Sequence, residues 1–389
     1  MGKAMDFEKI RKARRRGIFL RRLVILAAIM IGIFSIMSLN NLLVHWQFPT
    51  LANNFLQGFG GPGFPLQAPG GTLRDVKALG SDIVVLNDSN LHLYNRRGRE
   101  LLNIQRISEN TILLTTGNRM LTYSNGSPAF QIHFQNRLIF EAEHDNPIIS
   151  AALGARGNYA LVSSTMQFTS QVTVFTERFE QYFQWSSSEL VAMVALNARG
   201  TEMAAGSIGA SGGQFLSTVF LFAFDNTEVV RRLELPGELI LDLEYLSNDR
   251  IGIITDKGLR IMDAGTGMLI NSYDISAGRI ALARMSGEYI LLLNENPEYR
   301  AQTVILLSAM GVELGRSEPE TPVRDMQVGG GRVYVLTSGG VLRYGNGMNL
   351  TGEAQQTGIQ RILLAGNALY YFTGDEIRVM DSSQFTMDN

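Results

Sequence analysis

The sequence predicts an all-β protein, an eight-bladed β-propeller behind a single N-terminal transmembrane helix. Three observations support this prediction. A basic tail precedes an unbroken apolar run, a Gly- and Pro-rich segment follows that run, and from residue 72 onward a β-hairpin pattern recurs about every 41 residues. We expect four regions: a cytoplasmic tail over 1–22, the helix over 23–44, a juxtamembrane segment and linker over 45–71, and the propeller over 72–389.

The apolar run extends from Leu23 to Leu39 without a charged residue. A Lys or Arg at the centre of a membrane-spanning helix costs roughly 2.5–3.5 kcal/mol on insertion scales, so such a charge-free stretch is typical of a membrane segment. Nine Lys and Arg precede it against Asp6 and Glu8, and the next basic residue after it is Arg74. Because Lys and Arg gather on the cytoplasmic side, we expect a cytoplasmic N-terminus and an exported domain.

A cleaved signal peptide is the alternative interpretation of the same run. The apolar core of a signal peptide usually spans about 7–15 residues and ends at a cleavage site with small residues. Here the run is longer, and Asn40 and Asn41 with further apolar residues stand where that site would be. We therefore predict a retained signal-anchor that contacts the lipid bilayer through one helix. Under either interpretation the bulk of the chain is exported.

Composition limits the partners of the exported part. The tail carries nine basic and two acidic residues, so the rest of the chain has a net charge of about −9. An acidic domain is not expected to bind nucleic acid. The chain has no cysteine, which excludes disulfides and thiolate metal sites. An exported domain without disulfides suits a bacterial envelope better than a eukaryotic secretory route.

The linker is predicted from its glycine and proline content. Between Gln57 and Gly71, nine of fifteen residues are Gly or Pro, which excludes a helix or a central strand. We expect this segment to be a flexible tether. Trp46, Phe48 and Phe55 precede it, as in an aromatic belt at the membrane interface.

The repeat that follows consists of two apolar runs rich in Val, Ile, Leu, Tyr and Phe, joined by a turn with Gly, Asn or Asp. Such units are typical of β-hairpins. Shorter apolar segments between them supply two further strands, and four strands per 40–45 residues indicate propeller blades. A two-sheet sandwich rarely exceeds about 250 residues. The eight hairpins cover 83–98, 112–126, 159–179, 202–226, 251–267, 289–311, 333–347 and 369–383.

The number of blades and the closure of the ring are less directly specified. The first interval between hairpins is much shorter than the second, so the segment 137–144 can belong to the second blade with a shifted strand assignment. Eight hairpins favour eight blades, and seven is the alternative. The chain ends soon after the last hairpin, which leaves the final blade without an outer strand. The segment 72–79, or the one just before it, is expected to supply that strand.

At this stage the chain resembles known propeller families. The turns over 95–102, 197–207 and 263–274 resemble the hairpin ends of WD-repeat and quinoprotein-like blades. The layout as a whole is similar to an uncharacterised bacterial family, mostly from Firmicutes, of single-pass membrane-anchored propellers with a domain of unknown function. The resemblance brings no catalytic motif. The only tryptophans are Trp46 and Trp185, too few for the blades that hold a quinone, so no cofactor is expected.

Two short motifs could suggest catalysis or metal binding. Residues 209–213 match G-x-S-x-G, but a nucleophile elbow needs a strand-turn-helix setting and a later His, and no His follows this hairpin loop. The acidic cluster over 141–145 includes His144, yet a solvated strand end explains it better than a metal site. We therefore predict no catalytic, cofactor-binding or metal-binding residues.

Binding residues are predicted from hairpin length. Most hairpins turn within about two to four residues, whereas three have longer connections, over 165–171, 208–217 and 294–302. In propellers these connections open on the same face as the blade-to-blade crossovers. Neutral variation in loop length is the alternative, but loops that display apolar groups often form interfaces. The candidate binding residues are Met166, Phe168, Phe215 and Tyr299.

Two functions from different classes remain. The first is a non-catalytic binding or scaffold module that is tethered outside a bacterial cell and recognises an envelope protein or a wall polymer. The second is an extracytoplasmic propeller enzyme, either glycoside hydrolase-like with carboxylates in the channel or a degenerate quinoprotein. The first is favoured because no set of catalytic groups is visible. The carboxylates that line the central channel should discriminate between the two.

Overall fold

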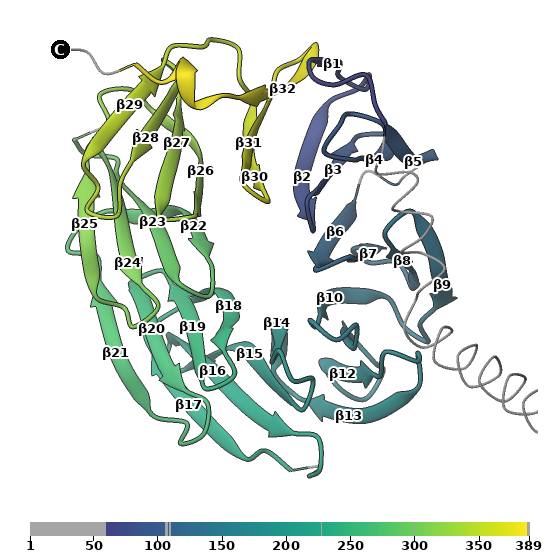
Figure 1. The fold of residues 1–389 in the computed structure, drawn as a ribbon. Coiled ribbons are helices and arrows are strands. Elements are labelled where there is room, and N and C mark those ends of the chain that lie inside the picture. Colours follow the sequence, from purple (N-terminus) through teal and green to yellow (C-terminus); the bar gives the residue numbers. More distant parts are fainter. Residues whose placement is uncertain (1–59, 106–107, 109, 227, 300, 387–389) are drawn as a thin grey trace, which may run out of the picture. The chain divides into compact units, whose positions relative to one another are not determined.

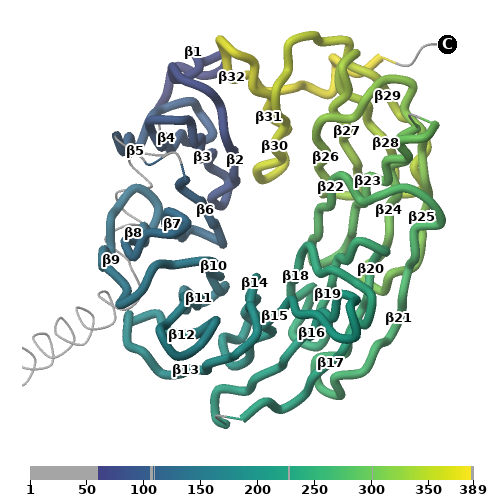
Figure 2. The backbone as a smooth tube through the Cα atoms, turned by 180° about the vertical axis from the view of Figure 1, so that it is seen from behind, coloured from purple at the N-terminus to yellow at the C-terminus, as the bar shows by residue number. Residues whose placement is uncertain are grey.

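The structure, a computed structural model, describes residues 60–386 except 106, 107, 109, 227 and 300. The described residues form eight four-stranded antiparallel sheets around a central channel, as Figures 1 and 2 show. The prediction of an all-β, eight-bladed propeller is therefore confirmed, and seven blades is excluded.

Blades 1 to 7 each run in chain order from an inner strand at the channel to an outer strand at the rim, and only the outer strand of blade 8 comes from elsewhere in the described part of the chain. Blade 1 contains β2 (Leu73–Leu79), β3 (Asp82–Asn87), β4 (Asn90–Tyr94) and β5 (Glu100–Gln105). Blade 2 contains β6 (Thr111–Thr116), β7 (Arg119–Ser124), β8 (Ala129–Phe134) and β9 (Arg137–Glu143). Blade 3 contains β10 (Ile148–Leu153), β11 (Tyr159–Ser163), β12 (Ser170–Phe175) and β13 (Gln181–Ser187). Blade 4 contains β14 (Leu190–Leu196), β15 (Glu202–Ser211), β16 (Gln214–Ala223) and β17 (Arg231–Pro236).

The second half of the ring repeats this order. Blade 5 contains β18 (Ile240–Ser247), β19 (Arg250–Thr255), β20 (Gly258–Asp263) and β21 (Leu269–Asp274). Blade 6 contains β22 (Arg279–Met285), β23 (Tyr289–Asn296), β24 (Ala301–Ser308) and β25 (Glu313–Ser317). Blade 7 contains β26 (Val323–Gly329), β27 (Arg332–Thr337), β28 (Val341–Tyr344) and β29 (Leu350–Ala354). Blade 8 contains β30 (Arg361–Ala365), β31 (Ala368–Phe372), β32 (Glu376–Met380) and β1 (Leu66–Gln67), and a short 3-10 helix, Ser382–Gln384, follows β32.

The core lies between neighbouring blades. The middle strands of a blade are covered on both faces, so β11 is buried along its whole length and reads as a continuous apolar run. Val162 and Val174 of blade 3 pack with Met203 and Phe222 of blade 4 in one apolar cluster. Because burial of a large apolar side chain contributes roughly 1.5–3 kcal/mol, these joints between blades hold the ring together.

The ring is closed by a strand from before the first blade. In β1, Leu66 lies opposite Ile377 of β32, and the N–H of Ala68 donates to the carbonyl of Asp375 at 2.7 Å. In both Figures 1 and 2, β1 and β32 lie side by side. The segment 72–79 is the inner strand β2 of blade 1 and does not close the ring. Of the two sequence-based alternatives, the segment just before it is therefore correct.

The second part of the predicted linker differs in the structure from the flexible tether that the sequence predicts. The segment 61–71 packs on the propeller: the N–H of Gly63 donates to the carbonyl of Arg97 at 2.9 Å, and the ring of Phe64 meets Tyr370 edge-on at 5.2 Å. The high Gly and Pro content of this segment is compatible with strand pairing, because the closing strand consists only of Leu66 and Gln67, which are neither Gly nor Pro. The propeller thus begins earlier than the predicted boundary at 72.

The predicted tail, anchor and juxtamembrane segment, residues 1–59, lie outside the described residues. Among the residues that the structure describes, no helix has the length and hydrophobicity needed to cross a bilayer.

Blade 2 explains the irregular spacing of the hairpins. Seven of the eight predicted hairpins join the second and third strands of a blade, whereas 112–126 corresponds to β6 and β7, the first and second strands. The segment 137–144 contains β9, the outer strand of the same blade. The shifted strand assignment considered from the sequence is therefore correct.

The alternating strand directions define two faces of the disc. The blade-to-blade crossovers and the turns between second and third strands open on one face, which we call the crossover face. The turns between first and second and between third and fourth strands open on the opposite face. Three of the predicted binding residues, Met166, Phe168 and Tyr299, lie in turns of the crossover face, and Phe215 lies in β16 next to such a turn.

Candidate functional site

The three predicted long loops differ in kind. In blade 3 a true loop, 164–169, joins β11 to β12. In blade 4 the strands continue to Ser211 and Gln214 and leave a two-residue turn, Gly212 and Gly213, with φ values of 60° and 80°. Glycine tolerates these angles, which suit a tight hairpin turn. The predicted loops of blades 4 and 6 are therefore mostly paired strand, because chain length between turns does not reveal how far pairing extends.

The blade 4 hairpin extends beyond its own sheet. The inner strand β14 pairs with β15 as far as Ile208, which lies opposite Leu190. The outer strand β17 pairs with β16 as far as Leu216, which lies opposite Pro236. Beyond these residues β15 and β16 still pair with each other, up to Ser211 and Gln214. The tip of the hairpin therefore stands above the crossover face. Phe215, at the base of this tip, is 56% exposed.

The blade 3 loop presents two further apolar side chains. Thr165 folds the loop back, because its hydroxyl accepts from the N–H of Phe168 at 3.0 Å and its own N–H donates to the Phe168 carbonyl at 3.1 Å. This turn holds Phe168 in a half-exposed position, while Met166 at its apex is fully exposed.

Two buried serines bring the loops together with the crossovers. The hydroxyl of Ser170 accepts from the N–H of Val191 at 2.9 Å, and that of Ser217 accepts from the N–H of Ile240 at 3.1 Å. Each serine follows an exposed aromatic residue by two positions and fixes the start of the next inner strand. As a result, Leu190 and Leu241, both half-exposed, lie beside the loops of blades 3 and 4.

We call this surface the crossover patch. The crossover from blade 3 to blade 4 carries the carboxylate of Glu189 beside this surface. This carboxylate accepts a hydrogen bond from the Ser207 hydroxyl and so turns inward. The patch consists of Met166, Phe168, Leu190, Phe215 and Leu241.

Sequence reasoning missed Leu190 and Leu241. It considered only the turns between second and third strands, whereas these residues stand at the starts of inner strands. Leu241 is the extra residue of a β-bulge, because Ile240 pairs with Thr255 and Asp242 with Ile254. A bulge reverses the inside–outside alternation, so the exposure of Leu241 could not be read from the sequence.

Tyr299 lies on the same face but apart from the patch. It is 77% exposed in the turn between β23 and β24 of blade 6. The intervening blade 5 turn carries the ion pair Lys257–Asp256 at 3.4 Å, and Arg279 pairs with Glu295 at 2.6 Å at the edge of blade 6. The structure thus brings three of the four predicted residues onto adjacent blades and leaves Tyr299 behind a charged strip.

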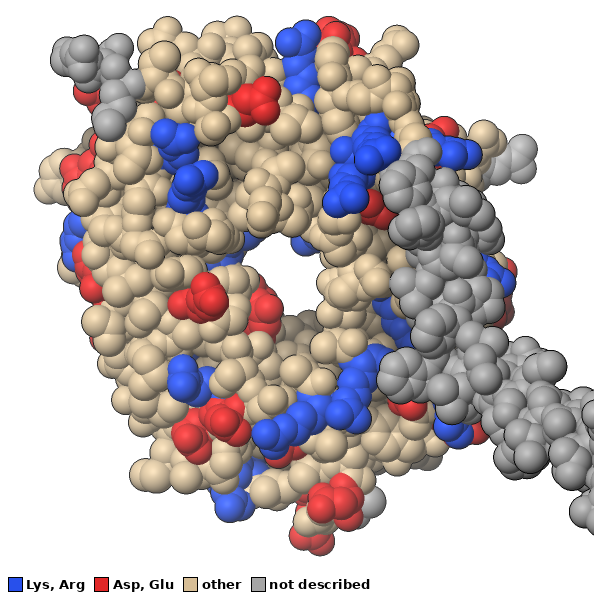
Figure 3. Space-filling model, viewed as in Figure 1, with Lys and Arg blue, Asp and Glu red and all other residues tan. Residues whose placement is uncertain are grey.

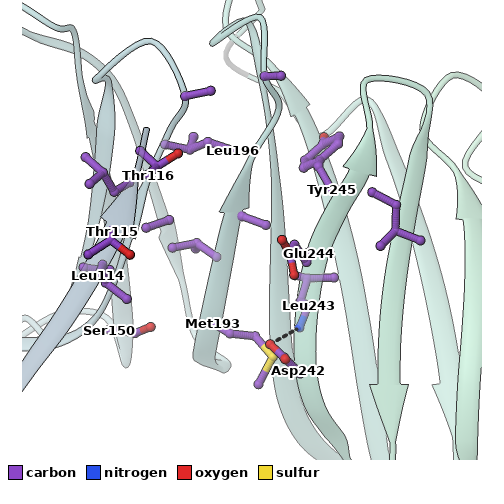
Figure 4. A pocket seen from close by; sticks show the side chains of 18 of the residues that line it. Leu114, Thr115, Thr116, Ser150, Met193, Leu196, Asp242, Leu243, Glu244 and Tyr245 are labelled. Carbon is purple, nitrogen blue, oxygen red and sulfur yellow. Dashed lines mark hydrogen bonds between the residues drawn. The ribbon is translucent and has the colours of Figure 1, made fainter. Parts of the chain in front are cut away.

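The second candidate site is the central channel, which is open at its mouth in Figure 3. It contains a cavity of about 570 Å³ lined by the inner strands of blades 1 to 5. The lining from β6, β10 and β14 is mostly apolar or hydroxyl-bearing. The charged groups come from β2 and β18: Lys77, Asp242 and Glu244. Figure 4 shows the two carboxylates on β18, across the cavity from Leu114, Thr115 and Ser150.

The channel shifts the protonation of both carboxyl groups. The surrounding protein and the neighbouring charge of Asp242 raise the pKa of Glu244 to about 7, although Lys77 acts in the opposite direction. Burial also raises the pKa of Asp242, against a hydrogen bond from the N–H of Leu243 at 2.9 Å and the charges of Arg284 and Lys77. A carboxyl group with a pKa near neutrality can hold or release a proton under physiological conditions.

This channel is mixed rather than strongly acidic. Glycosidases place one carboxyl group on each side of the scissile bond. Asp242 and Glu244 instead stand two residues apart on one strand and therefore line one wall of the channel. The arrangement gives a proton-binding pair beside an apolar cavity, and it does not reproduce the flanking geometry of a glycosidase.

The two short sequence motifs do not assemble sites. Gly209 and Ser211 lie in β15 of the protruding hairpin, without the strand-turn-helix setting of a nucleophile elbow. In the acidic cluster of blade 2, Glu141 accepts from the Gln131 amide at 2.7 Å, while Nε2 of His144 contacts the Ser163 hydroxyl at 3.2 Å. In the described part of the chain, no three His, Asp or Glu side chains are placed to hold a metal ion.

Comparison with known families identifies the chain by its sequence. Residues 69–381 match the family of unknown function DUF5711, and the chain belongs to this family. No match was found among curated protein sequences.

Solved structures with the same fold are distant in sequence. The chain is similar to the C-terminal WD40 domain of Sif2, with 15% identity and a TM-score of 0.58 over 81% of this chain and 100% of that chain. It is similar to Sqt1 of Saccharomyces cerevisiae, with 11% identity and a TM-score of 0.59 over 83% and 100% of the two chains. The match to BamB of Moraxella catarrhalis has 11% identity and a TM-score of 0.51 over 82% and 97%. These likenesses show that the chain shares the propeller fold of WD40 domains and of BamB.

Proposed function

We propose that this member of the DUF5711 family is a non-catalytic binding or scaffold module, tethered outside a bacterial cell by residues 23–44, that captures an envelope protein. The propeller fold is suited to such a role because it displays loops from many blades on one rigid face. The ligand contacts in this proposal are the crossover patch and Tyr299, which lies apart from the patch on the same face.

The crossover patch is the observation that carries this proposal. Its five members come from two kinds of connection in three adjacent blades, and each is at least about 40% exposed. The Ser170 and Ser217 hydrogen bonds hold these connections next to one another. Two of them are aromatic, and aromatic anchors surrounded by apolar groups are typical of binding hot spots. A partner with an apolar surface fits this chemistry better than a polar wall polymer, because the patch offers few hydrogen-bonding side chains.

The proposed location rests on the sequence alone. The charge-free run over 23–39 follows nine basic residues, which favours a cytoplasmic N-terminus and an exported propeller. The absence of cysteine and the acidic balance of the remaining chain fit a bacterial envelope. The propeller would then stand within reach of envelope proteins that share the same membrane.

Capture by the intact cell tests both parts of the proposal. A membrane-impermeant crosslinker is added to spheroplasts that carry the full chain, and the products of Phe168→Ala and Phe215→Ala are compared with wild type. We expect each substitution to weaken capture by more than about 1 kcal/mol, roughly fivefold, because each removes an aromatic anchor. Folding should be unchanged because both side chains are exposed.

Leu138→Ala is the matched control, since Leu138 is 49% exposed on the outer strand of blade 2, away from the patch. Equal losses in all three variants would contradict the assigned surface. Products that form only after the membrane is permeabilised would contradict the outward topology. Co-sedimentation with isolated cell wall that Phe168→Ala abolishes would identify a wall polymer in place of a protein.

A propeller enzyme is the second candidate, and the channel favours it through one observation. Glu244, with its pKa near 7, shares a cavity with Asp242 and is suited to proton transfer. Hydrolysis of a panel of glycosides by the full chain, lost in Glu244→Gln, would support this function over the first. Turnover that persists in Glu244→Gln would exclude the channel as its site.

A further inference from the structure

A second surface, on the rim of blades 5 to 7, is assigned neither by the motifs nor by the crossover patch. It lies at the ends of the outer strands on the face opposite the crossovers, around the turns between third and fourth strands. Its large apolar side chains are each between 39% and 70% exposed. We call it the rim patch: Met268, Leu269, Ile270, Met310, Val312, Leu314 and Leu350.

The rim patch is continuous across the blades. The amide of Asn271 in blade 5 donates to the carbonyl of Met310 in blade 6 at 2.8 Å. Blade 6 meets blade 7 where Gly315 approaches the carbonyl of Gly347 so closely that a Cβ would lie 2.5 Å from the oxygen. The turn of each blade therefore rests on the outer strand of the blade before it, and the exposed side chains form one surface.

Other blades carry charge at the same position. The outer strand of each of these blades has a β-bulge near its start. In blades 1, 2 and 3 the residue just before the bulged part of the strand is charged and exposed: Arg99, Arg137 and Glu180. At this position blades 5 and 6 have Met268 and Val312. Charged side chains on an edge strand prevent edge-to-edge association. Blades 5 and 6 lack this protection at that position.

The charged pair nearest the middle of the patch is satisfied within the chain. Arg316 pairs with Glu313 at 2.6 Å, and the hydroxyl of Tyr273 donates to the same carboxylate at 2.7 Å. The carboxylate is thus neutralised beside the apolar side chains. An apolar partner surface can approach without leaving Glu313 uncompensated.

The chain covers the edge of the neighbouring blade 7 with its own C-terminal segment. Thr386, near the C-terminus, exchanges two backbone hydrogen bonds with Glu353 of β29, at 2.8 and 3.0 Å. The strands β21 and β25, like β29, stand at the outer ends of their sheets. A segment outside the sheet thus already pairs with β29, the outer strand of blade 7. The outer strands of blades 5 and 6 can pair with a partner strand in the same way.

We infer that the rim patch binds a second copy of this chain around a two-fold axis. Seven side chains, each about half exposed, present on the order of 600 Å² of apolar surface, near the roughly 800 Å² per partner of a standard interface. Homodimer interfaces are more apolar than other interfaces and are depleted in charge, as this surface is. Antiparallel pairing of β25 with its symmetry mate satisfies two strand edges at once. This inference does not depend on the function proposed for the crossover patch.

The absence of cysteine from the chain makes a direct test possible. Val312 belongs to the middle blade of the patch and lies near the axis of such a dimer, so Val312→Cys in the full chain should crosslink to itself. Membranes are treated with a short bismaleimide, and the dimer is measured by gel and mass spectrometry. The matched control is Arg99→Cys, which occupies the same position in blade 1. We expect a crosslinked dimer for Val312→Cys and not for Arg99→Cys.

A second variant tests the apolar contact. Adding Leu314→Arg to Val312→Cys should reduce the dimer to the level of Arg99→Cys, with an unchanged melting temperature because Leu314 is exposed. Equal crosslinking of the two single-cysteine variants would overturn the proposal, since it would report collisions within the membrane. An adduct with another protein would overturn the second copy as occupant. Protection of Val312→Cys from maleimide by the bilayer, without a dimer, would assign the patch to the membrane instead.

Discussion

Asp242 and Asp325 occupy the same position in two blades, but their surroundings differ. Each is the third residue of an inner strand, β18 or β26, where the ladder register shifts by one residue. In each, Oδ1 accepts the N–H of the following residue at 2.9 Å. This shared contact satisfies a backbone donor at the bulge, and Asp75 of blade 1 makes it too.

The two carboxylates differ in their other partners. Asp325 is 1% exposed, pairs with Arg284 of blade 6 at 3.0 Å, and accepts the N–H of Ile362 of blade 8 at 3.2 Å. It therefore joins three blades. Asp242 faces the channel, where Glu244 is its neighbour on the strand. The position in the repeat thus determines the backbone contact, while the neighbouring blades determine whether the carboxylate supports the ring or faces the channel.

Substitution of Asp325 should have the largest effect. In Asp325→Ala the side chain of Arg284 loses its partner, and two backbone N–H groups lose their acceptor. The Arg284 side chain is 40% exposed, so its remaining charge is partly solvated, and most of the loss comes from the two unsatisfied buried N–H groups. We expect a cost of about 2–4 kcal/mol of folding free energy. The measurement is urea unfolding of the full chain at neutral pH. Asp75→Ala is the control, because it removes the same bulge contact at a half-exposed position and should cost about 1 kcal/mol or less.

Equal destabilisation by Asp325→Ala and Asp75→Ala would contradict the comparison. It would mean that the bulge contact, shared by both, accounts for the whole effect and that the ion pair with Arg284 adds nothing.

The pH dependence of stability should reveal the channel carboxyl group. The folded protein raises the pKa of Glu244 to about 7 from its ordinary 4.5. Between these values the folded state holds a proton that the unfolded state has released, so the stabilisation contributed by this group is fully present below pH 4.5 and is lost as the pH rises toward 7. Because the group is open to the water of the channel, we expect a contribution on the order of 1 kcal/mol.

Glu244→Gln should remove this contribution, and the difference in unfolding free energy between wild type and variant should change between pH 4.5 and 7 and stay constant above that range. A difference that does not vary with pH would contradict the raised pKa.

The sequence contained much of this fold and little of the channel. Hairpins and blade number depend on local alternation and turn residues, which a single sequence displays. The closing strand was recognised only as one of two segments, because β1 has two residues and no apolar pattern of its own. The second blade was misaligned because its first turn, around Gly117, resembles the turns that join second to third strands elsewhere.

The distribution of roles among the aspartates could not be predicted. The segments LRDVK, ILDLE and VRDMQ each place Asp before an apolar residue, and this shared pattern marks the bulge. Nothing local to the pattern distinguishes Asp325 from Asp242. The distinction comes from Arg284, which lies about 40 residues from each and is brought between them by the ring. Long-range placement of one charge therefore separates a structural carboxylate from a channel carboxylate.

The smallest expected effect on stability belongs to Asp242→Asn. The amide oxygen can still accept the N–H of Leu243, and the side chain faces the channel, so we expect a change within about 0.5 kcal/mol. The pKa of Glu244 should nevertheless fall, because the negative charge of Asp242 is one of the causes that raise it. Carboxyl titration of Glu244 by NMR in the full chain measures this shift, with Glu234→Gln on the outer strand of blade 4 as a control that should leave it unchanged. A Glu244 titration that is identical in Asp242→Asn and wild type would show that burial alone sets this pKa. The two channel carboxylates would then titrate independently. Asp242 and the ion-paired Asp325 would then differ in burial rather than in the charges that surround them.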